Sequence, residues 1–261
     1  MRPRQTGLCI LAIFFSLFMI ACGQGEKKAE DSKTTDTSGT AATDTTKTVA
    51  PETTPDAVKA APTLYKTIQD TLGIRILEAD YKPGDSSALH SHPDYALYVI
   101  QGGKTEFIGK DGNKMETEMK SADENIRAAE IHSVKNTGKT EVKVLLVEVS
   151  RPMGTTSFDS KMDASKVAGN LYKVTKDTMG IRILHVTYKP GQSSAMHSHP
   201  DLALYTISGG TVEFTEKDGK KIKSELKTGM SAVVPADTHN VKNIGKTTAK
   251  VLLVEVNRPM K

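Results

Sequence analysis

Most of the chain is built from short segments in which apolar and polar side chains alternate. Ile74–Tyr81, Ala96–Gln101 and Val142–Val149 carry Ile, Val, Leu or Tyr at about every second position, which is the period of a half-buried β-strand. Turn signals such as Lys82-Pro83-Gly84 and Lys110-Asp111-Gly112 separate these segments. No long segment has the 3.6-residue period of a helix. Many short strands at close spacing predict an all-β barrel or sandwich.

The strand pattern occurs twice. Residues 64–153 return as residues 171–260 without insertion or deletion, and 54 of the 90 compared positions are identical. This is a tandem duplication in which each copy is long enough to form a small domain. We predict domain 1 over residues 63–153, a polar connector over 154–170 with a short helix near Ser165–Ala168, and domain 2 over 171–261.

The beginning of the chain has the pattern of an export signal. Arg2 and Arg4 precede a mostly apolar run, Leu8–Ala21, which is too short to cross a bilayer. The run ends at Met19-Ile20-Ala21-Cys22, which resembles the lipobox of bacterial lipoproteins, whose cysteine is acylated. We predict a lipoprotein signal peptide over 1–21 and lipidation of Cys22; an ordinary secretory signal is the alternative. The protein is then exported and lipid-anchored to a membrane of the bacterial cell envelope, on its periplasmic side or at the cell surface.

The composition separates a tether from the domains and excludes one class of partner. Residues 22–62 are rich in Thr, Ser, Ala, Lys and Asp and cannot bury enough apolar surface to fold, so we predict a disordered tether. The net charge is +4, and without Arg2 and Arg4 it falls to +2, which is too balanced for a nucleic-acid-binding surface. We therefore expect no nucleic-acid partner, while the oligomeric state stays open.

Histidines are the candidate chemistry of the domains. On a strand, residues i and i+2 face the same side, so each His-Ser-His sequence presents two imidazoles to one point, and a third histidine follows at the same spacing in both copies. Three neutral imidazoles suit a divalent first-row transition metal (Fe, Mn, Zn, Ni or Cu) with open coordination positions. An accidental spacing on a surface strand is the alternative, and the recurrence of the whole set argues against it. The predicted ligands are His90, His92 and His132 in copy one and His197, His199 and His239 in copy two. The seventh histidine, His185, is expected to be a solvated strand residue.

These spacings resemble the two sequence motifs of the cupin superfamily. Copy one matches the first motif with Gly84, His90, His92 and Gly103, and copy two matches it with Gly191, His197, His199 and Gly210. Copy two also follows the second motif with Gly229, Pro235, His239 and Asn243. Copy one keeps His132 and Asn136 but has Ala122 and Ala128 in place of the glycine and proline. The resemblance covers nearly all of 64–261 and implies a bicupin with two tandem, jelly-roll-like β-barrels, each with a site inside.

Both copies depart from the cupin motif at one ligand. The motif's glutamate would fall at Ala96 and Ala203, so the usual fourth ligand is absent. A bound metal would keep its full positive charge and more open coordination, which favours a small anionic chelating ligand such as a carboxylate, enolate or thiolate.

Several acidic residues near the motifs have expected roles. Asp94 and Asp201 share the strand face of the histidine pairs and could supply the missing charge. Glu130 and Asp237 precede the third histidines by two positions. All four acidic residues are expected beside the ligands or in solvent. Glu148 and Glu255 are expected to face solvent.

Two functions fit these features. The first is an envelope-anchored bicupin that binds a divalent transition metal and a small anionic ligand without turnover. The alternative is a metal-dependent cupin oxygenase acting on a small chelating acid or diketone-like substrate, because such three-histidine sites look like those of some cupin dioxygenases. No general acid or base is identifiable by residue type and spacing, so no catalytic residue is assigned. A purely structural duplicated barrel is disfavoured by the histidines.

Overall fold

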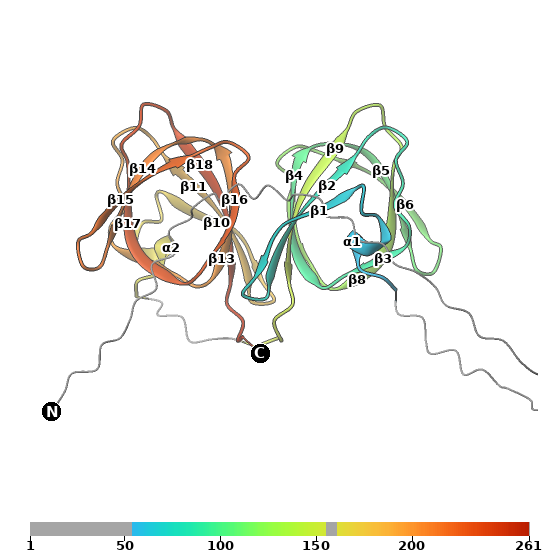
Figure 1. The fold of residues 1–261 in the computed structure, drawn as a ribbon, viewed down its shortest axis with the longest axis horizontal. Helices are drawn as coiled ribbons and strands as arrows, with labels where there is room; N and C mark the ends of the chain where they lie inside the picture. Colours follow the sequence, from blue (N-terminus) through green and yellow to red (C-terminus); the bar gives the residue numbers. More distant parts are fainter. Residues whose placement is uncertain (1–53, 155–160, 261) are drawn as a thin grey trace, which may run out of the picture. The chain divides into compact units, whose positions relative to one another are not determined.

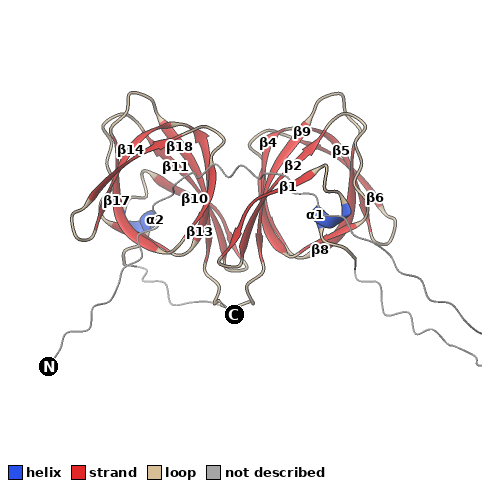
Figure 2. Cartoon of the chain, viewed as in Figure 1, coloured by secondary structure: helices blue, strands red, loops and turns tan. Residues whose placement is uncertain are grey.

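The computed structural model describes residues 54–154 and 161–260, which form two β-barrels in tandem (Figures 1 and 2). The predicted signal peptide, Cys22 and most of the predicted tether lie outside the described residues. Within the described part of the chain, no helix is long and apolar enough to cross a membrane.

The two barrels contain matching elements. The first comprises α1 (Ala57–Ala60), β1 (Tyr65–Thr71), β2 (Ile74–Tyr81), β3 (His90–His92), β4 (Asp94–Gln101), β5 (Gly103–Gly109), β6 (Lys114–Met119), β7 (Glu124–Arg127), β8 (Glu130–Asn136) and β9 (Val142–Val149). The second comprises α2 (Ala164–Val167), β10 (Tyr172–Thr178), β11 (Ile181–Tyr188), β12 (His197–His199), β13 (Leu202–Ser208), β14 (Gly210–Glu216), β15 (Lys221–Leu226), β16 (Ser231–Val234), β17 (Asp237–Asn243) and β18 (Ala249–Val256).

Each barrel is made of two antiparallel sheets. In the first barrel a five-stranded sheet has the order β1-β2-β9-β4-β7 and a four-stranded sheet has the order β3-β8-β5-β6. The second barrel repeats both as β10-β11-β18-β13-β16 and β12-β17-β14-β15. The predicted all-β fold with tandem jelly-roll-like barrels is therefore confirmed, and the alternating side chains give each sheet one face toward its own barrel interior.

The first barrel begins earlier in the sequence than predicted. Residues 54–62, which were expected to belong to the tether, pack against the barrel: Ala57 is fully buried, and Asp56 caps α1 by accepting a hydrogen bond from the backbone N–H of Val58. Asp163 occupies the equivalent position of the second copy and caps α2 in the same way. Helix α2 confirms the short helix predicted in the connector. The repeat thus extends further upstream than the strand pattern indicates.

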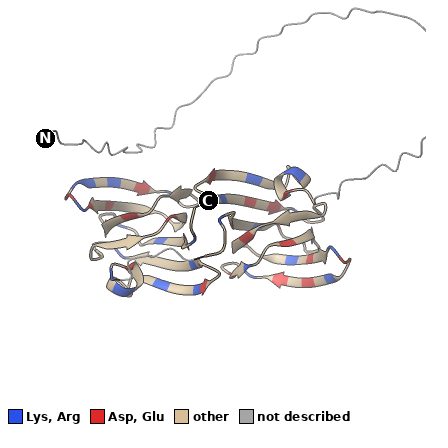
Figure 3. Cartoon of the chain, turned by 90° about the horizontal axis from the view of Figure 1, so that it is seen from below, with Lys and Arg blue, Asp and Glu red and all other residues tan. Residues whose placement is uncertain are grey.

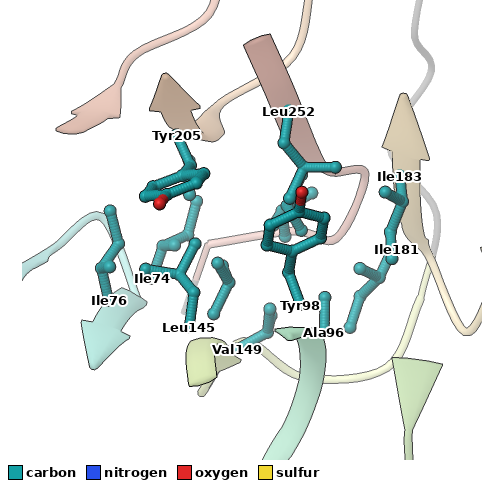
Figure 4. Close-up of a cluster of buried hydrophobic side chains, with 14 of the residues drawn as sticks. Ile74, Ile76, Ala96, Tyr98, Leu145, Val149, Ile181, Ile183, Tyr205 and Leu252 are labelled. Atoms are coloured by element: carbon teal, nitrogen blue, oxygen red, sulfur yellow. The ribbon is translucent and has the colours of Figure 1, made fainter. Parts of the chain in front are cut away.

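The five-stranded sheets pack against each other across the two barrels. Their outer faces carry apolar side chains that form one buried cluster spanning both copies (Figure 4). Tyr98 and Tyr205 meet there with ring centroids 5.8 Å apart. His185, expected in solvent, instead lies 2.8 Å from Glu124 (Nε2 to Oε2), a residue of the other barrel. The central strands are therefore buried on both faces, which explains their nearly continuous apolar character.

Two arginines complete the contact between the barrels. Arg151 donates to Asp201 (Nη2 to Oδ2, 2.5 Å), and Arg258 donates to Asp94 (Nη2 to Oδ2, 2.8 Å). Each arginine also donates to the backbone carbonyl of the other, at 3.1 Å from Arg151 and 3.3 Å from Arg258. The contact is reciprocal because both copies contribute the same residues. We call these two arginines and two aspartates the arginine latch.

Charged residues of both signs are interspersed along the strands of both barrels (Figure 3). On the paired strands β5 and β6, Lys114 lies 3.3 Å from Glu106, and the equivalent Lys221 lies 2.9 Å from Glu213 on β15 and β14. Such exposed pairs contribute little stability. Lysine and glutamate on the edge strands β6 and β15 do disfavour pairing with the edge of another sheet.

The turn between β6 and β7 and its counterpart between β15 and β16 have the same shape despite a sequence difference. Ala122 has a φ of 70° and Gly229 has a φ of 82°, and their N–H groups donate to the carbonyls of Val99 and Thr206. This left-handed conformation is unfavourable for alanine but not for glycine.

We therefore expect Ala122→Gly to raise the free energy of unfolding by about 1 kcal/mol. Gly229→Ala is the matched reverse change and should lower it by a similar amount. Urea unfolding of both variants, compared at constant m-value, measures these differences. An unchanged unfolding midpoint for Ala122→Gly would show that the left-handed conformation of Ala122 does not destabilise the native protein.

Candidate metal centre

The three predicted histidines of each copy converge inside their barrel. In the first barrel β3 pairs with β8 so that His90 lies directly opposite His132, and in the second β12 pairs with β17 so that His197 lies opposite His239. His92 and His199 lie two positions further along the same strand face. One ring nitrogen from each member of a set lies within 4.8 Å of the others, close enough for one ion. Strand register therefore brings the six predicted ligands together as two sets of three, one in each barrel.

The histidine rings are held with one nitrogen toward the barrel interior. His90 and His197 place Nδ1 at 2.7 and 2.8 Å from the backbone carbonyls of Ala88 and Ala195. Because a carbonyl only accepts, Nδ1 carries the proton and Nε2 keeps its lone pair. Burial lowers the pKa of both histidines from 6.5 to about 4, so they are neutral at pH 7. A neutral imidazole with a free Nε2 is the form that binds a metal.

The remaining four histidines have carboxylate partners at Nδ1. Glu148 lies 2.6 Å from Nδ1 of His92, and Glu255 lies 2.5 Å from Nδ1 of His199. Both glutamates are 1% exposed, so the expectation that they face solvent is wrong. The strands that carry them are covered by the other barrel on one face, and the glutamates project from the opposite face toward the histidines. A carboxylate that orients a ligating histidine raises its basicity.

Each buried glutamate is itself held by an arginine. Arg182 donates to Glu255 (Nε to Oε2, 2.7 Å) and to Asp163 (Nη1 to Oδ2, 2.7 Å). In the first barrel Arg75 bridges Glu148 and Asp56 in the same way. One signal for this network is present in the sequence: the aspartate, arginine and glutamate recur at equivalent positions of the two copies, as the histidines do.

Glu130 and Asp237 lie beside the third histidines. Asp237 lies 3.0 Å from Nδ1 of His239, and Glu130 lies 3.4 Å from Nδ1 of His132. Burial alone would raise the pKa of Glu130, but hydrogen bonds from His132, Tyr95 and Arg127 outweigh it and hold the pKa at about 2. Glu130 is therefore an anion that positions His132 and also accepts from Tyr95 and Arg127.

Asp94 and Asp201 do not face the histidines. Both belong to the arginine latch, and their second oxygens accept from the backbone N–H of Ala129 and Ala236 at 2.8 and 2.7 Å. They therefore supply no charge to the metal site, and the expectation that they lie beside the ligands or in solvent is wrong. Each aspartate lies at the contact between the barrels, where an arginine compensates its charge.

The position expected for a fourth ligand also faces away from the site. Ala96 and Ala203 belong to the apolar cluster between the barrels. The neighbouring residues on these strands turn inward instead: Tyr95 has its ring 5.3 Å from that of His92, and Leu202 lines the cavity of the second barrel. In neither barrel does this part of the strand direct a carboxylate toward the histidines.

A tyrosine packs against each histidine cluster, and its contacts with the histidines differ between the two copies. Tyr65 places its hydroxyl 3.0 Å from Nε2 of His90, and burial raises the pKa of Tyr65 well above its usual range. In the second barrel Tyr172 packs on His197 with ring centroids 4.7 Å apart. Nε2 of His197 is nevertheless buried without a hydrogen-bond partner among the described residues. The two tyrosines occupy equivalent positions of the repeat, but no sequence signal places them at the site.

The orphaned nitrogen of His197 tests whether the site fits a metal. A buried polar atom without a partner costs about 1–3 kcal/mol, so native proteins seldom retain one unless a ligand or ion completes it. A cation bound at Nε2 of all three histidines would satisfy it. The residues of the second barrel therefore fit a divalent transition metal. Those of the first barrel fit it when the hydrogen bond between Tyr65 and Nε2 of His90 is broken.

Comparisons with known proteins agree with this fold. Residues 184–255 match a family described as Cupin domain. A variant of oxalate decarboxylase from Bacillus subtilis superimposes with a TM-score of 0.54 and 17% identity, covering 76% of this chain and 73% of that one. A study of the Mn(II) centres of the same decarboxylase gave a structure with a TM-score of 0.51 and 17% identity, covering 78% and 72%. AerE from Microcystis aeruginosa matches with a TM-score of 0.52 and 13% identity, covering 74% and 97%. No curated protein matches the chain.

Residues 184–255 of the second barrel are thus similar to the Cupin domain family, and the two barrels together share the fold of the bicupin oxalate decarboxylase. The second barrel carries the family match, and the first is its duplicate at 54 of 90 positions. Identities as low as these show the fold alone. The chemistry of the site has to come from the residues of this chain.

Proposed function

We propose that the protein is an envelope-anchored bicupin that binds a divalent transition metal at each three-histidine cluster and holds a small anionic ligand on that metal. The observation that carries the proposal is the buried Nε2 of His197, which has no hydrogen-bond partner among the described residues. The Nδ1 atoms of all three histidines in this cluster already lie beside acceptors. Three neutral ligands bring no negative charge into direct contact with a divalent ion, which favours an anion at the open positions.

The roles of the residues follow from their contacts. A bound divalent metal would supply positive charge and Lewis acidity at the centre of the barrel. The histidines hold it, while Glu148 and Glu255 fix the tautomer of His92 and His199. Tyr65 and Tyr172 stay protonated, because burial raises the pKa of each, and each can donate a hydrogen bond to a bound anion.

Calorimetric titration of the full chain with Mn²⁺ or Co²⁺ tests metal binding. We expect two equivalents, one removed by the combined alanine variant of His90, His92 and His132 and the other by that of His197, His199 and His239. The second barrel should bind more tightly. In the first barrel the metal has to displace a Tyr65 hydrogen bond worth about 1 kcal/mol, which corresponds to about fivefold in affinity.

A titration without heat of binding, or binding that survives both histidine variants, would contradict the metal proposal. Equal metal affinities of the two sites would show that the hydrogen bond from Tyr65 does not weaken metal binding in the first barrel. Tyr65→Phe is the matched variant, because it removes the hydroxyl, keeps the ring and should bring the first site close to the second.

The anchoring part of the proposal depends on Cys22. We expect Cys22→Ser to abolish membrane attachment while both barrels stay folded, since the residue precedes the described barrels in sequence. Several acyl chains, at about 0.8 kcal/mol for each buried CH₂, make attachment of the unchanged protein stable. Fractionation of cells after a high-salt wash measures it, and a variant that remains in the membrane pellet would overturn the assignment.

A further inference from the structure

The two histidine clusters open on cavities of different size. The cavity beside His199 and His239 in the second barrel has a volume of about 120 Å³, whereas the cavity beside His92 and His132 in the first has about 40 Å³. A cavity of about 150 Å³ holds a benzene molecule, and a single water needs about 10–15 Å³. The larger cavity therefore has room for a tail of about four carbon atoms, and the smaller one has room for a few waters.

A few substitutions between the copies account for the difference. Tyr95 projects into the first cavity, where its hydroxyl donates to Glu130, and the equivalent residue in the second barrel is Leu202. Arg127 pairs with Glu130 at 2.9 Å, and its equivalent is Val234, which lines the larger cavity. A polar cluster of Tyr95, Arg127 and Glu130 thus occupies a region of the first barrel that is open in the second.

The walls of the larger cavity decide the kind of molecule that fits. Apart from the two histidines and the tyrosines Tyr172 and Tyr188, its lining is aliphatic or aromatic, as at Leu204, Val212 and Phe214. No lysine, arginine, asparagine or glutamine is among these lining residues. A longer dicarboxylate such as succinate, whose two carboxylates are separated by two methylenes, would place its second charged group against apolar walls without a partner, which is costly. An apolar tail would instead be removed from water there.

We propose that the second barrel is the ligand-binding barrel and that its ligand is a small monocarboxylate with an apolar tail of about four carbons. This inference rests on the proposed metal site, which supplies the positive charge for the carboxylate. The tail occupies the cavity between Leu202, Val212 and Phe214, whereas the cavity beside His92 and His132 in the first barrel has no room for such a tail.

The test is a calorimetric titration of the Co²⁺-loaded full chain with the straight-chain acids from acetate to heptanoate, and with succinate. Each methylene added within the cavity should raise the affinity about fourfold, because burying a CH₂ contributes about 0.8 kcal/mol. Butanoate should therefore bind about fifteenfold more tightly than acetate, and the increase should stop when the cavity is full. The visible absorption of Co²⁺ provides a second readout, since its bands shift when a carboxylate enters the coordination sphere.

Two variants of Leu202 locate the tail. Leu202→Tyr restores the residue of the first barrel and should remove the dependence on chain length while two equivalents of Co²⁺ still bind. Leu202→Ala enlarges the cavity and should move the point of saturation to a longer acid. Because the acid series on the unchanged chain is informative by itself, a variant that fails to fold does not remove the test.

The outcomes separate this inference from the metal proposal. If the chain binds Co²⁺ but its affinity for the acid is the same from acetate to pentanoate, or succinate binds more tightly than butanoate, the ligand class is wrong and the metal site stands. If the chain binds no Co²⁺, the metal proposal fails and the ligand proposal fails with it.

Discussion

Replacing the buried carboxylate of Glu255 by an amide is expected to lower the metal affinity of the second barrel by about 10- to 100-fold. In the native chain Glu255 accepts from Nδ1 of His199 and from Arg182, and its side chain is almost completely buried. Glu255→Gln keeps the shape but removes the negative charge. The preference of His199 for the Nδ1–H tautomer is then weaker, and its Nε2 is a poorer ligand.

Metal titration of Glu255→Gln measures this effect, and two matched variants serve as controls. Glu148→Gln should weaken the first site by a similar factor and leave the second unchanged. Glu225→Gln changes an exposed glutamate on β15 and should alter neither site. A Glu255→Gln protein with unchanged metal affinity would show that strand pairing alone orients His199.

The second large effect is expected at the arginine latch. Arg258→Ala should lower the free energy of unfolding by about 3 kcal/mol, because it leaves Asp94 without its buried partner. The Arg258 side chain is 2% exposed and the Asp94 side chain 19%, so water can offset part of the loss. The change also removes donors to the carbonyls of Met179 and Arg151.

Urea unfolding of Arg258→Ala measures this loss. Arg151→Ala makes the equivalent change in the other copy and should cost a similar amount. The double variant Arg258→Ala with Asp94→Ala should lose less than the sum of its single variants, because the two residues interact directly. Additive losses would show that the ion pair itself contributes nothing.

The fold and the convergence of the histidines could be predicted because they depend on periodic features of the sequence. Alternating apolar positions indicated the strands, and the repeat indicated two domains with matching histidines at His90 and His197. The alternation of side chains along a strand was sufficient to direct each histidine pair to one point. The start of the first barrel was missed because α1 is one turn long and lies in a segment of polar composition.

The surroundings of the ligands could not be predicted from the same features. Glu148 lies in an apolar strand, and alternation by itself indicated a solvent-facing side chain. Its burial depends on a strand that is covered on both faces, which is decided by the packing of the barrels against each other. Asp94 was misplaced for the same reason, since its partner Arg258 lies 164 residues away and in the other copy.

The reciprocal contact between the barrels has a consequence for how such a chain can diversify. Because each copy offers the same patch to the other, the interface is isologous, the arrangement typical of a symmetric dimer of single barrels. The connector keeps the two patches at a high effective concentration, so their association does not depend on how much protein is present. A symmetric dimer has to change both of its sites at once. Here one copy can retain Leu202 and an open cavity while the other acquires Tyr95 and closes it.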